Sequence, residues 1–360
     1  MRRTLPPSAV NDPAALARFA RLDYVTDQGP GFSRRRNGHG FVYLNNRGEA
    51  LRDPRKIKRI ESLVIPPAWK EVWICPTSKG HLQATGRDDR QRKQYLYHER
   101  WQYVANLAKF ARMGKFGQIL PKLRRSIART LAGDRLSPQR VLAGMVALLD
   151  LTGVRIGNEE YARENGSYGL STLRDRHIAV RQGGVELRFR AKGGIHREVL
   201  VEDAMLAEFI QECAAVKGAR LFQCLDGSGK PRPIGASDIN EYLQQVAGEA
   251  VTAKDFRTWK ASSQAAGRFY AAGAKASKTA RKRLARETIC EAANLLSNTP
   301  AVCRNYYIHP GLIASYEDGS FDDYLAGFQP RRQKLFAADE KVLARFLSQW
   351  KPAETPGREA

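Results

Sequence analysis

The sequence has few cysteines and no long apolar run, and these two shortages exclude several classes of protein. Its 360 residues include five cysteines, and no two of them form a CxxC pair with metal-ligand spacing. A disulfide framework or a zinc site is therefore not expected. No stretch approaches the roughly 18 apolar residues that a transmembrane helix needs, and no apolar segment of a signal peptide follows the N-terminus. We expect a protein without membrane spans that acts in the cytoplasm.

Common catalytic motifs are also missing. The sequence contains neither HExxH nor GxSxG, and Gly229-Lys230 lacks the upstream glycine of a phosphate-binding P-loop. The six histidines never stand at the i, i+4 spacing of a helical metal pair. The adjacent acids Asp88-Asp89 and Asp322-Asp323 are typical of capped or solvated turns rather than of a magnesium site. The sequence therefore predicts no metal ion and no other cofactor.

Acidic residues are scarce relative to basic ones. Lys and Arg number 60 against 37 Asp and Glu, which gives a formal net charge of +23. This excess is spread through segments that have folded patterning, rather than confined to a tail. A solvated cationic surface is the simple interpretation, but the strength of the imbalance favours a polyanionic partner such as nucleic acid.

The length and the 42% apolar content suffice for a full core and fit two domains. The first hundred residues are rich in strand patterns. Residues 41–44 followed by a turn at 45–48 predict a hairpin, a short helix is expected at 56–63, and 71–75 with 81–85 predict a second strand pair. This part of the chain predicts a small β-sheet module.

After about Trp101 the apolar spacing changes to a helical period. Ser137-Pro138 is a typical helix start, with the serine as cap and the proline at the first position. Between His177 and Val201 the pattern predicts a three-stranded meander, with turns at Gly183-Gly184 and after Lys192. Later helices are expected at 202–214, 237–247, 257–271, 278–297, just after Thr299-Pro300, and at 338–349.

These patterns predict an α+β protein with a boundary near residue 105. Residues 1–105 are expected to form the β-rich N-terminal domain, and 106–350 a larger, mainly α-helical domain that contains the meander. The polar residues 351–360 are expected to form a disordered tail.

A few cations in the helical part remain as candidates for chemistry. Arg155 follows the end of an apolar helix, where arginines commonly satisfy helix carbonyls. Arg257 lies among aromatic residues that suit a cation–π contact or an ion pair. Lys192 stands at a Gly-Gly hairpin tip, where a solvated lysine is common. Taken one at a time, each has a structural role as its simpler interpretation.

The segment around Asn298 and Tyr307 is more specific. Asn298-Thr-Pro, followed nine residues later by Tyr307-Ile-His-Pro, resembles the active-site tyrosine segment of bacterial type IB DNA topoisomerases, relatives of the poxvirus enzymes. Three other stretches, 63–70, 85–98 and 152–159, resemble the same family in its usual order. The resemblance extends from roughly residue 20 to residue 345.

The resemblance implies a catalytic set. Tyr307 takes the place of the nucleophile because it directly precedes Ile-His-Pro, with Tyr306 as its neighbour. Arg155 and Arg257 match the two phosphate-binding arginines, and Lys192 matches the lysine general acid.

A further position of that set departs from some relatives. Asn298 stands where poxvirus and eukaryotic enzymes have histidine, a departure typical of the bacterial branch. It implies a neutral hydrogen-bond donor to the phosphate. The implied reaction is relaxation of positive and negative supercoils through a 3′-phosphotyrosyl intermediate, without ATP or metal, because guanidinium, ammonium and amide groups stabilise the developing charge.

The resemblance also implies how DNA is held. Gln94, Tyr95 and Tyr97 match the family's groove-reading cluster, and Arg87 and Lys93 flank it; an ordinary strand with two aromatics on one face is the alternative. The basic run that follows Gly273 contains no acid and suits a helix against phosphates, although a solvated cationic helix fits nearly as well. Its basic residues are Lys275, Lys278, Arg281, Lys282, Arg283 and Arg286.

Two domains of this kind imply a monomer that closes as a clamp around double-stranded DNA in the bacterial nucleoid. A tyrosine recombinase is one alternative, but it is expected to carry histidine three positions before the second arginine, where this chain has Lys254. A noncatalytic architectural DNA binder is the other, and it gives no reason for the spacing between Asn298 and Tyr307.

Overall fold

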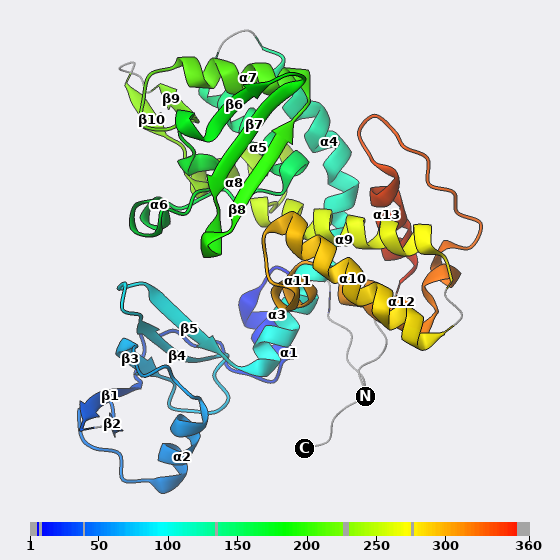
Figure 1. The fold of residues 1–360 in the computed structure, drawn as a ribbon. Helices are drawn as coiled ribbons and strands as arrows, with labels where there is room; N and C mark the ends of the chain where they lie inside the picture. Colours follow the sequence, from blue (N-terminus) through cyan, green and yellow to red (C-terminus); the bar gives the residue numbers. More distant parts are fainter. Residues whose placement is uncertain are drawn as a thin grey trace. The chain divides into compact units, whose positions relative to one another are not determined.

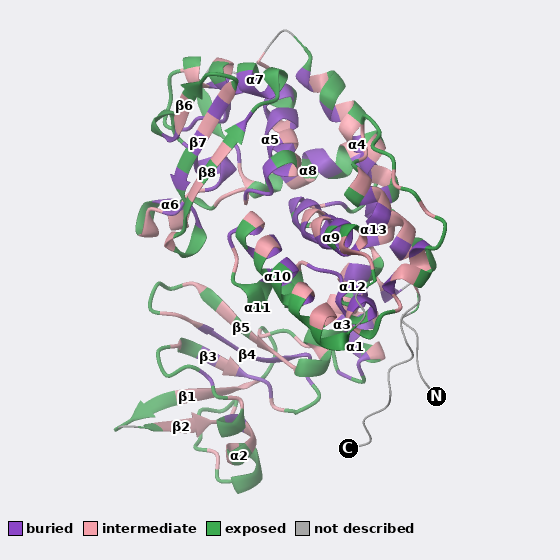
Figure 2. Ribbon diagram, turned by 45° about the vertical axis from the view of Figure 1, so that its right-hand side comes forward, coloured by how far each residue is buried: buried purple, intermediate pink, exposed green. Residues whose placement is uncertain are grey.

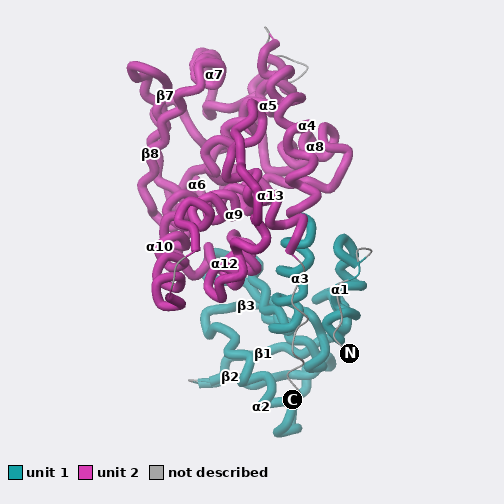
Figure 3. Tube along the Cα trace, turned by 90° about the vertical axis from the view of Figure 1, so that its right-hand side faces the viewer, with its two compact units in different colours: residues 1–112, 353–360 teal, residues 113–352 magenta. Residues whose placement is uncertain are grey.

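The structure is a computed structural model, and it describes residues 6, 9–38, 40–133, 136–225, 230–274 and 277–350. The chain divides into two compact units, Met1–Arg112 and Met113–Pro352 (Figure 3). Lys275 and the tail expected at 351–360 lie outside the described residues. Within the described ranges, no helix combines the length and the apolar character that a membrane crossing requires.

The first unit is built on an antiparallel five-stranded sheet in the order β2-β1-β3-β4-β5. Its core contains Ile74 and Ala84, both fully buried, together with Ile60 from a short helix. The strands are β1 (Phe32–Asn37), β2 (Gly40–Leu44), β3 (Lys70–Ile74), β4 (Leu82–Arg87) and β5 (Lys93–Tyr97), and the short helix is α2 (Pro54–Ser62). The predicted strand pair at 71–75 and 81–85 is therefore confirmed as β3 and β4.

The hairpin predicted after Phe41 forms only in part: beyond the turn, Leu44 makes a single antiparallel bridge to Ala50, and Leu51 N donates to Tyr43 O at 2.8 Å. The turn after Asn45 forms, since Gly48 N donates to Asn45 O at 3.0 Å, but β2 pairs along its length with β1, which precedes it. Strand β1 carries no local signal of a strand, because Phe32 is its only apolar residue.

Two helices form a second small core in this unit. Helix α1 (Pro13–Phe19) contributes Leu16 and Ala17, and α3 (Glu99–Ala111) contributes Val104 and Ala108. Asp12 caps α1 by accepting from two backbone amides of its first turn. The position near residue 105 at which the sequence suggested a boundary lies inside α3.

The second unit is mainly helical. Its elements are α4 (Met113–Leu131), α5 (Pro138–Thr152), α6 (Glu159–Asn165), β6 (Ile178–Arg181), β7 (Gly184–Arg190), β8 (His196–Val201), α7 (Ala204–Ala215), β9 (Gln223–Leu225), β10 (Pro231–Pro233), α8 (Ala236–Ala247), α9 (Ala253–Ala272), α10 (Lys278–Leu296), α11 (Pro300–Tyr306), α12 (Pro310–Asp318) and α13 (Ala338–Gln349). The predicted α+β class and the predicted later helices are confirmed, while the short α6, α12 and β9–β10 pair were not predicted.

The predicted start of α5 is confirmed in detail. Ser137 accepts a hydrogen bond from Arg140 N at 3.2 Å, and Pro138 occupies the first helical turn. The helix ends at Gly153, whose φ of 64° is the left-handed conformation that glycine adopts at helix ends.

Helix α9 lies at the centre of this unit and is mostly buried (Figure 2). Its Trp259 packs against Gly117 of α4, where an added Cβ would stand 2.3 Å from the indole ring. Trp259 Nε1 also donates to Glu340 of α13 at 2.9 Å. Arg124 of α4 pairs with Glu340 at 2.7 Å and with Asp150 of α5 at 2.6 Å. These contacts hold α9 rigidly between α4, α5 and α13.

The predicted meander is confirmed as the antiparallel sheet β6-β7-β8, which packs against α7 (Figure 1). Val185, Leu187 and Phe189 of β7 are buried on its inner face. Phe189 pairs with Arg197 of β8, so Arg197 shares this inner face because directly paired residues of antiparallel strands lie on the same side.

Candidate active site

The site is built around the ends of α5 and α10. The last carbonyl groups of a helix have no partner within it. Helix α5 ends at Thr152 and turns away through Gly153, and α10 ends at Leu296 and turns away through Ser297, whose φ is 50°. The free carbonyls at these ends carry partial negative charge and attract cations.

Arg257 of α9 bridges the two helix ends. Its Nη1 donates to Gly153 O, and its Nη2 donates to Leu296 O at 3.0 Å. The side chain is held firmly because the residue is only 4% exposed. Both hydrogen bonds end on neutral carbonyls, so the positive charge of the guanidinium is not cancelled.

Arg155 lies two residues beyond Gly153 and points to the other helix end. It donates to Ser297 O at 3.2 Å and to Asn298 Oδ1. Asn298 is held by its own backbone amide, which donates to Ala293 O at 2.9 Å. The Nδ2 group of Asn298 is buried and has no hydrogen-bond partner among the described residues. Within the described residues, this donor therefore has no acceptor.

The charge of these arginines is uncompensated. Within the described residues, neither Arg155 nor Arg257 forms an ion pair with a carboxylate. Burial and the neighbouring Arg155 lower the pKa of Arg257 to about 10, so the group stays protonated at neutral pH. An anion bound between the two arginines would relieve their mutual repulsion.

Tyr307 lies directly beside these cations. It follows the last residue of α11, and its backbone carbonyl accepts from Ser262 Oγ at 3.0 Å. The guanidinium carbon of Arg257 is 5.2 Å from the centre of its ring. Burial raises the pKa of Tyr307, but Arg257, Arg155 and Lys254 outweigh burial and hold it below its usual value. The phenol is therefore easier to ionise than a free tyrosine.

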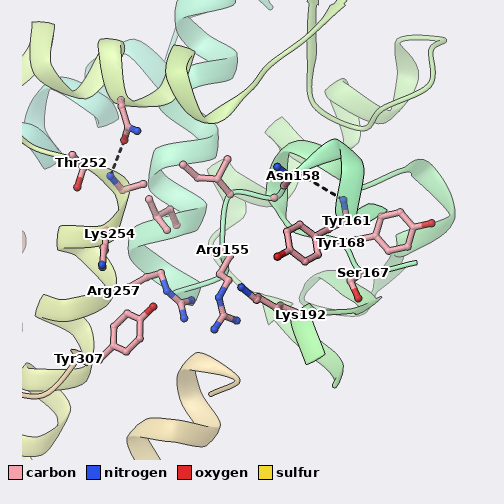
Figure 4. A pocket seen from close by; sticks show the side chains of 15 residues that line it. Arg155, Asn158, Tyr161, Ser167, Tyr168, Lys192, Thr252, Lys254, Arg257 and Tyr307 are labelled. Carbon is pink, nitrogen blue, oxygen red and sulfur yellow. Dashed lines mark hydrogen bonds between the residues drawn. The ribbon is translucent and has the colours of Figure 1, made fainter. Parts of the chain in front are cut away.

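These side chains line a cavity of about 500 Å³. Figure 4 shows Arg155, Lys192, Arg257 and Tyr307 directed into the same space from separate elements. The opposite wall carries Asn158, Tyr161, Ser167 and Tyr168. The structure thus brings together four of the five residues that the sequence motifs singled out. The fifth, Asn298, is connected to the cavity through its hydrogen bond with Arg155.

Lys192 occupies the turn between β7 and β8. It is exposed, and its Nζ lies 5.3 Å from the centre of the Tyr161 ring. Gly193 and Gly194 follow it with φ of 82° and 78°, so the tight turn depends on glycine. The hairpin places a flexible ammonium group at the edge of the cavity.

Three contributors to the site were not assigned a role there from sequence. Lys254 and Tyr161 line the cavity, and Arg197 approaches Ser297 with its Nη1 donating to Ser297 Oγ at 2.8 Å. Arg197 had a detectable signal: it alternates with Val199 and Val201 on β8, so the chain carries an arginine on a strand face that is otherwise apolar.

The residues expected to read the DNA groove lie on β5 of the first unit. Tyr95 and Tyr97 stack with ring centres 6.0 Å apart, and Tyr95 is 49% exposed. Gln94 alternates to the other face of the strand and donates to Asp88 Oδ2 at 2.9 Å. The two tyrosines therefore present one aromatic surface, from which Gln94 is separate.

The flanking cations of this unit are already paired. Lys93 lies 2.6 Å from a carboxylate oxygen of Asp27, and Arg87 lies 2.8 Å from one of Glu71. To contact a DNA phosphate, each of these cations would have to break its ion pair or bind the phosphate and its carboxylate at the same time.

The basic helix predicted after Gly273 is α10. Its Lys278 and Lys282 are exposed. Arg281 instead donates to Glu317 O at 3.2 Å, at the end of α12. Arg283 lies 3.7 Å from Glu287 one turn later. The helix therefore has a cationic exposed face, as expected for its composition.

This set of groups defines a class of site. An anionic phosphate ester suits this set of groups, which consists of arginines hydrogen-bonded to neutral carbonyls, a lysine and an amide donor. A tyrosine whose pKa is lowered lies beside them. In the described ranges, no three His, Cys, Asp or Glu side chains are grouped as metal ligands. The site is therefore a cationic cavity whose groups suit an anionic ester, with a phenol beside the cations.

Comparison with known proteins agrees with this class. The family model described as the catalytic core of eukaryotic DNA topoisomerase I matches residues 98–321, and the model of the N-terminal domain of bacterial DNA topoisomerase IB matches residues 40–88. The chain therefore belongs to the type IB DNA topoisomerase family, and it is a DNA topoisomerase whose substrate is DNA.

Individual relatives carry the same name. DNA topoisomerase 1B of Acanthamoeba polyphaga mimivirus is 34% identical over 239 residues, which cover 64% of this chain and 70% of the viral protein. DNA topoisomerase 1B of vaccinia virus is 20% identical over 273 residues, covering 73% of this chain and 80% of the relative. DNA topoisomerase 1 of Mycosarcoma maydis is 25% identical over 181 residues, 43% of this chain and 17% of the relative.

Proposed function

We propose that Tyr307 cuts one DNA strand by attacking a backbone phosphodiester and forming a 3′-phosphotyrosine. The observation that carries this proposal is the position of Tyr307 in the cavity beside Arg155 and Arg257, with a lowered pKa. A phenol is mostly protonated at neutral pH. The two guanidinium groups make its ionisation easier and also attract the phosphate that it attacks.

Arg155, Arg257 and Asn298 stabilise the transition state. Attack builds negative charge on the nonbridging oxygens of the phosphate, and preorganised donors are most effective there because they need no reorganisation. The guanidinium of Arg257 is fixed by the two helix ends, and Arg155 and Asn298 hold one another. Asn298 Nδ2 supplies a neutral donor.

Lys192 acts as the general acid. The 5′ oxygen of the cut strand is a poor leaving group unless it is protonated, and general acid catalysis contributes on the order of 10²- to 10⁴-fold. Lys192 is exposed on a hairpin tip at the edge of the cavity. From this position its ammonium group can reach the leaving oxygen once DNA is bound.

The proposed chemistry needs neither ATP nor a metal ion. The phosphotyrosine retains the energy of the phosphodiester, so the 5′ hydroxyl can attack it and religate the strand. Between the two steps the free end rotates, which relaxes supercoils of either sign. The required positive charge comes from side chains of the protein itself.

The remaining residues are proposed to hold the duplex. Tyr95 and Tyr97 contact a groove through their shared face of β5, Gln94 contacts DNA from the other face, and Arg87 and Lys93 contact phosphates. Lys278, Arg281 and Lys282 of α10 contact the backbone. We propose that the protein is a monomer that acts in the bacterial nucleoid. Its two domains, which the sequence patterns place at 1–105 and 106–350, close around the DNA.

The test is relaxation of supercoiled plasmid in EDTA without ATP. Positively and negatively supercoiled substrates are both expected to relax, and Tyr307→Phe, which retains the ring but lacks the nucleophilic oxygen, is the matched control. A strict requirement for Mg²⁺ or ATP would refute the proposed mechanism. Relaxation of one sign only would refute free rotation of the cut strand.

A further inference from the structure

Arg197 is a partly buried cation that the proposed chemistry does not use. It lies on β8, and its Nη1 donates to Ser297 Oγ at 2.8 Å while its Nη2 donates to Thr152 O at 2.6 Å. Its Nε is buried without a hydrogen-bond partner among the described residues. Burial and the nearby Arg155 lower its pKa to about 10. The side chain is thus held by two neutral oxygens while it keeps its charge.

The contacts of Arg197 repeat those of Arg257 from another element. Arg257, on α9, binds Gly153 O and Leu296 O. Arg197, on β8, binds Thr152 O and Ser297 Oγ, the adjacent residues on the same two helix ends. Each arginine therefore joins the end of α5 to the end of α10. Two such bridges fix how these ends lie relative to one another.

The catalytic groups project from these joined ends. Arg155 lies three residues after Thr152, and Asn298 is the residue directly after Ser297. A shift between the two helix ends would therefore separate Arg155 from Asn298 Oδ1, to which it donates. The position of both phosphate-binding groups depends on the bridge.

Arg197 also connects the lysine hairpin to this centre. It lies five residues after Lys192, and the turn between them is closed by Ala191 N donating to Ile195 O at 2.7 Å. Arg197 anchors the start of β8 to Thr152 and Ser297. It therefore fixes the position of the hairpin tip that carries Lys192.

The choice of a charged residue has a physical reason. Burying a cation without a carboxylate costs free energy, and a purely structural bridge needs no charge. Arg155 and Arg197 repel one another, since the proximity of Arg155 lowers the pKa of Arg197. The additional negative charge that develops on the phosphate during attack would relieve that repulsion, so the charge of Arg197 favours the transition state more than the bound ground state.

We propose that Arg197 is a positioning residue of the active site, which aligns Arg155, Asn298 and the Lys192 hairpin by joining the ends of α5 and α10. This inference rests on the proposed function of Tyr307. It assigns Arg197 to the chemical step rather than to DNA binding, because both of its terminal nitrogens already donate to the protein.

The experiment measures the chemical step separately from binding. The rate constant for covalent adduct formation is determined in a single turnover on an oligonucleotide that cannot religate, for wild type, Arg197→Ala and Arg197→Lys. Affinity for the same DNA is measured in the Tyr307→Phe background. The matched control is Arg188→Ala on the neighbouring strand β7, where the arginine side chain is 52% exposed.

Arg197→Ala is expected to lower the rate constant on the order of 10²-fold, the usual cost of misplacing catalytic groups by about 1 Å. Arg197→Lys is expected to lie between wild type and alanine, because an ammonium can keep one of the two contacts. Religation should fall by the same factor, leaving the cleavage equilibrium unchanged. DNA affinity and the Arg188→Ala control should match wild type.

Other outcomes would overturn the proposal. A normal rate constant with a smaller reacting fraction would assign Arg197 to stability alone, and a loss of DNA affinity that accounts for the whole effect would make it a DNA contact. If Arg197→Ala does not fold, Ser297→Gly carries the test, since it removes the Oγ acceptor and suits the φ of 50°; an unchanged rate constant there overturns the bridge. A wild-type protein that forms no adduct would instead refute the proposed function itself.

Discussion

Tyr306 and Tyr307 are neighbours in the chain but lie in different surroundings. Tyr307 lines the cavity with Arg257 over its ring, whereas Tyr306 is 39% exposed and is not among the residues that line the cavity. The difference arises at the end of α11, where Tyr307 leaves the helical conformation with φ of −128°. Of these two adjacent tyrosines, Tyr307 is therefore the one whose phenol lies beside the cations.

Replacing each tyrosine separately tests this assignment. Tyr307→Phe is expected to abolish covalent adducts with DNA, because it removes the attacking oxygen, and Tyr306→Phe is expected to retain them. The adduct is detected on a denaturing gel with DNA labelled at the 5′ end of the cut strand, which stays attached to a 3′-phosphotyrosine. Adducts that survive Tyr307→Phe and vanish in Tyr306→Phe would move the nucleophile to Tyr306.

Lys192 can be tested by changing the leaving group. Lys192→Ala is expected to slow cleavage on the order of 10²- to 10⁴-fold, the range for loss of a general acid. A substrate with sulfur in place of the bridging 5′ oxygen should restore most of that rate, because a thiol has a pKa of about 8.5 and leaves without protonation. Arg155→Ala is the control, since it loses a phosphate contact that sulfur does not replace. Equal rescue of both variants, or of neither, would contradict the role of Lys192.

At the scale of elements, helix ends rather than carboxylates hold the arginines. Arg257 and Arg197 donate to carbonyl and hydroxyl oxygens at the ends of α5 and α10. A carboxylate partner would neutralise each guanidinium, whereas a carbonyl or hydroxyl oxygen orients it and leaves its charge uncompensated. The geometry of the site therefore depends on how α5, α9 and α10 pack.

That packing can be probed with two glycines of α4. Gly117→Ala is expected to destabilise the protein by about 1–3 kcal/mol, the usual cost of overpacking, because its new Cβ would meet Trp259 of α9 at 2.3 Å. Gly114→Ala is the matched control in the same helix, where nothing lies within 4 Å of the new atom. It is expected to be neutral or slightly stabilising. Urea unfolding of the full chain measures both, and equal stability of the two variants would contradict close packing of α4 on α9.

Local signals predicted some elements well and others poorly. The start of α5 followed from Ser137-Pro138, and the meander followed from its alternation and its Gly-Gly turns, because such signals act between near neighbours. Strand β1 was not predicted because its run of arginines leaves no alternation of apolar and polar residues. It becomes a strand by pairing with β2 and β3, which no local pattern reveals.

At the scale of the whole molecule, the net charge of +23 makes binding to DNA sensitive to salt. The affinity of Tyr307→Phe for duplex DNA should fall linearly on a log–log plot against salt, with a slope of about 0.9 for each phosphate contact. Replacing exposed Lys278 and Lys282 of α10 with glutamine should reduce that slope by about 2. Lys115→Gln is the control, since Lys115 is already paired with Glu249 at 2.7 Å. A slope that is flat, or that changes equally in the control, would argue against specific phosphate contacts.

The sequence by itself determined the class of partner, the α+β composition and the residue types of the site. Charge is a sum over residues, and motifs such as Asn298-Thr-Pro and Tyr307-Ile-His-Pro are local, so both can be identified without coordinates. Only the tertiary structure decided which groups meet. Arg257 and Gly153 are 104 residues apart, and Arg197 and Ser297 are 100 apart. Their contacts exist because packing of α9 and β8 brings two helix ends together, and no periodicity along the chain encodes that distance.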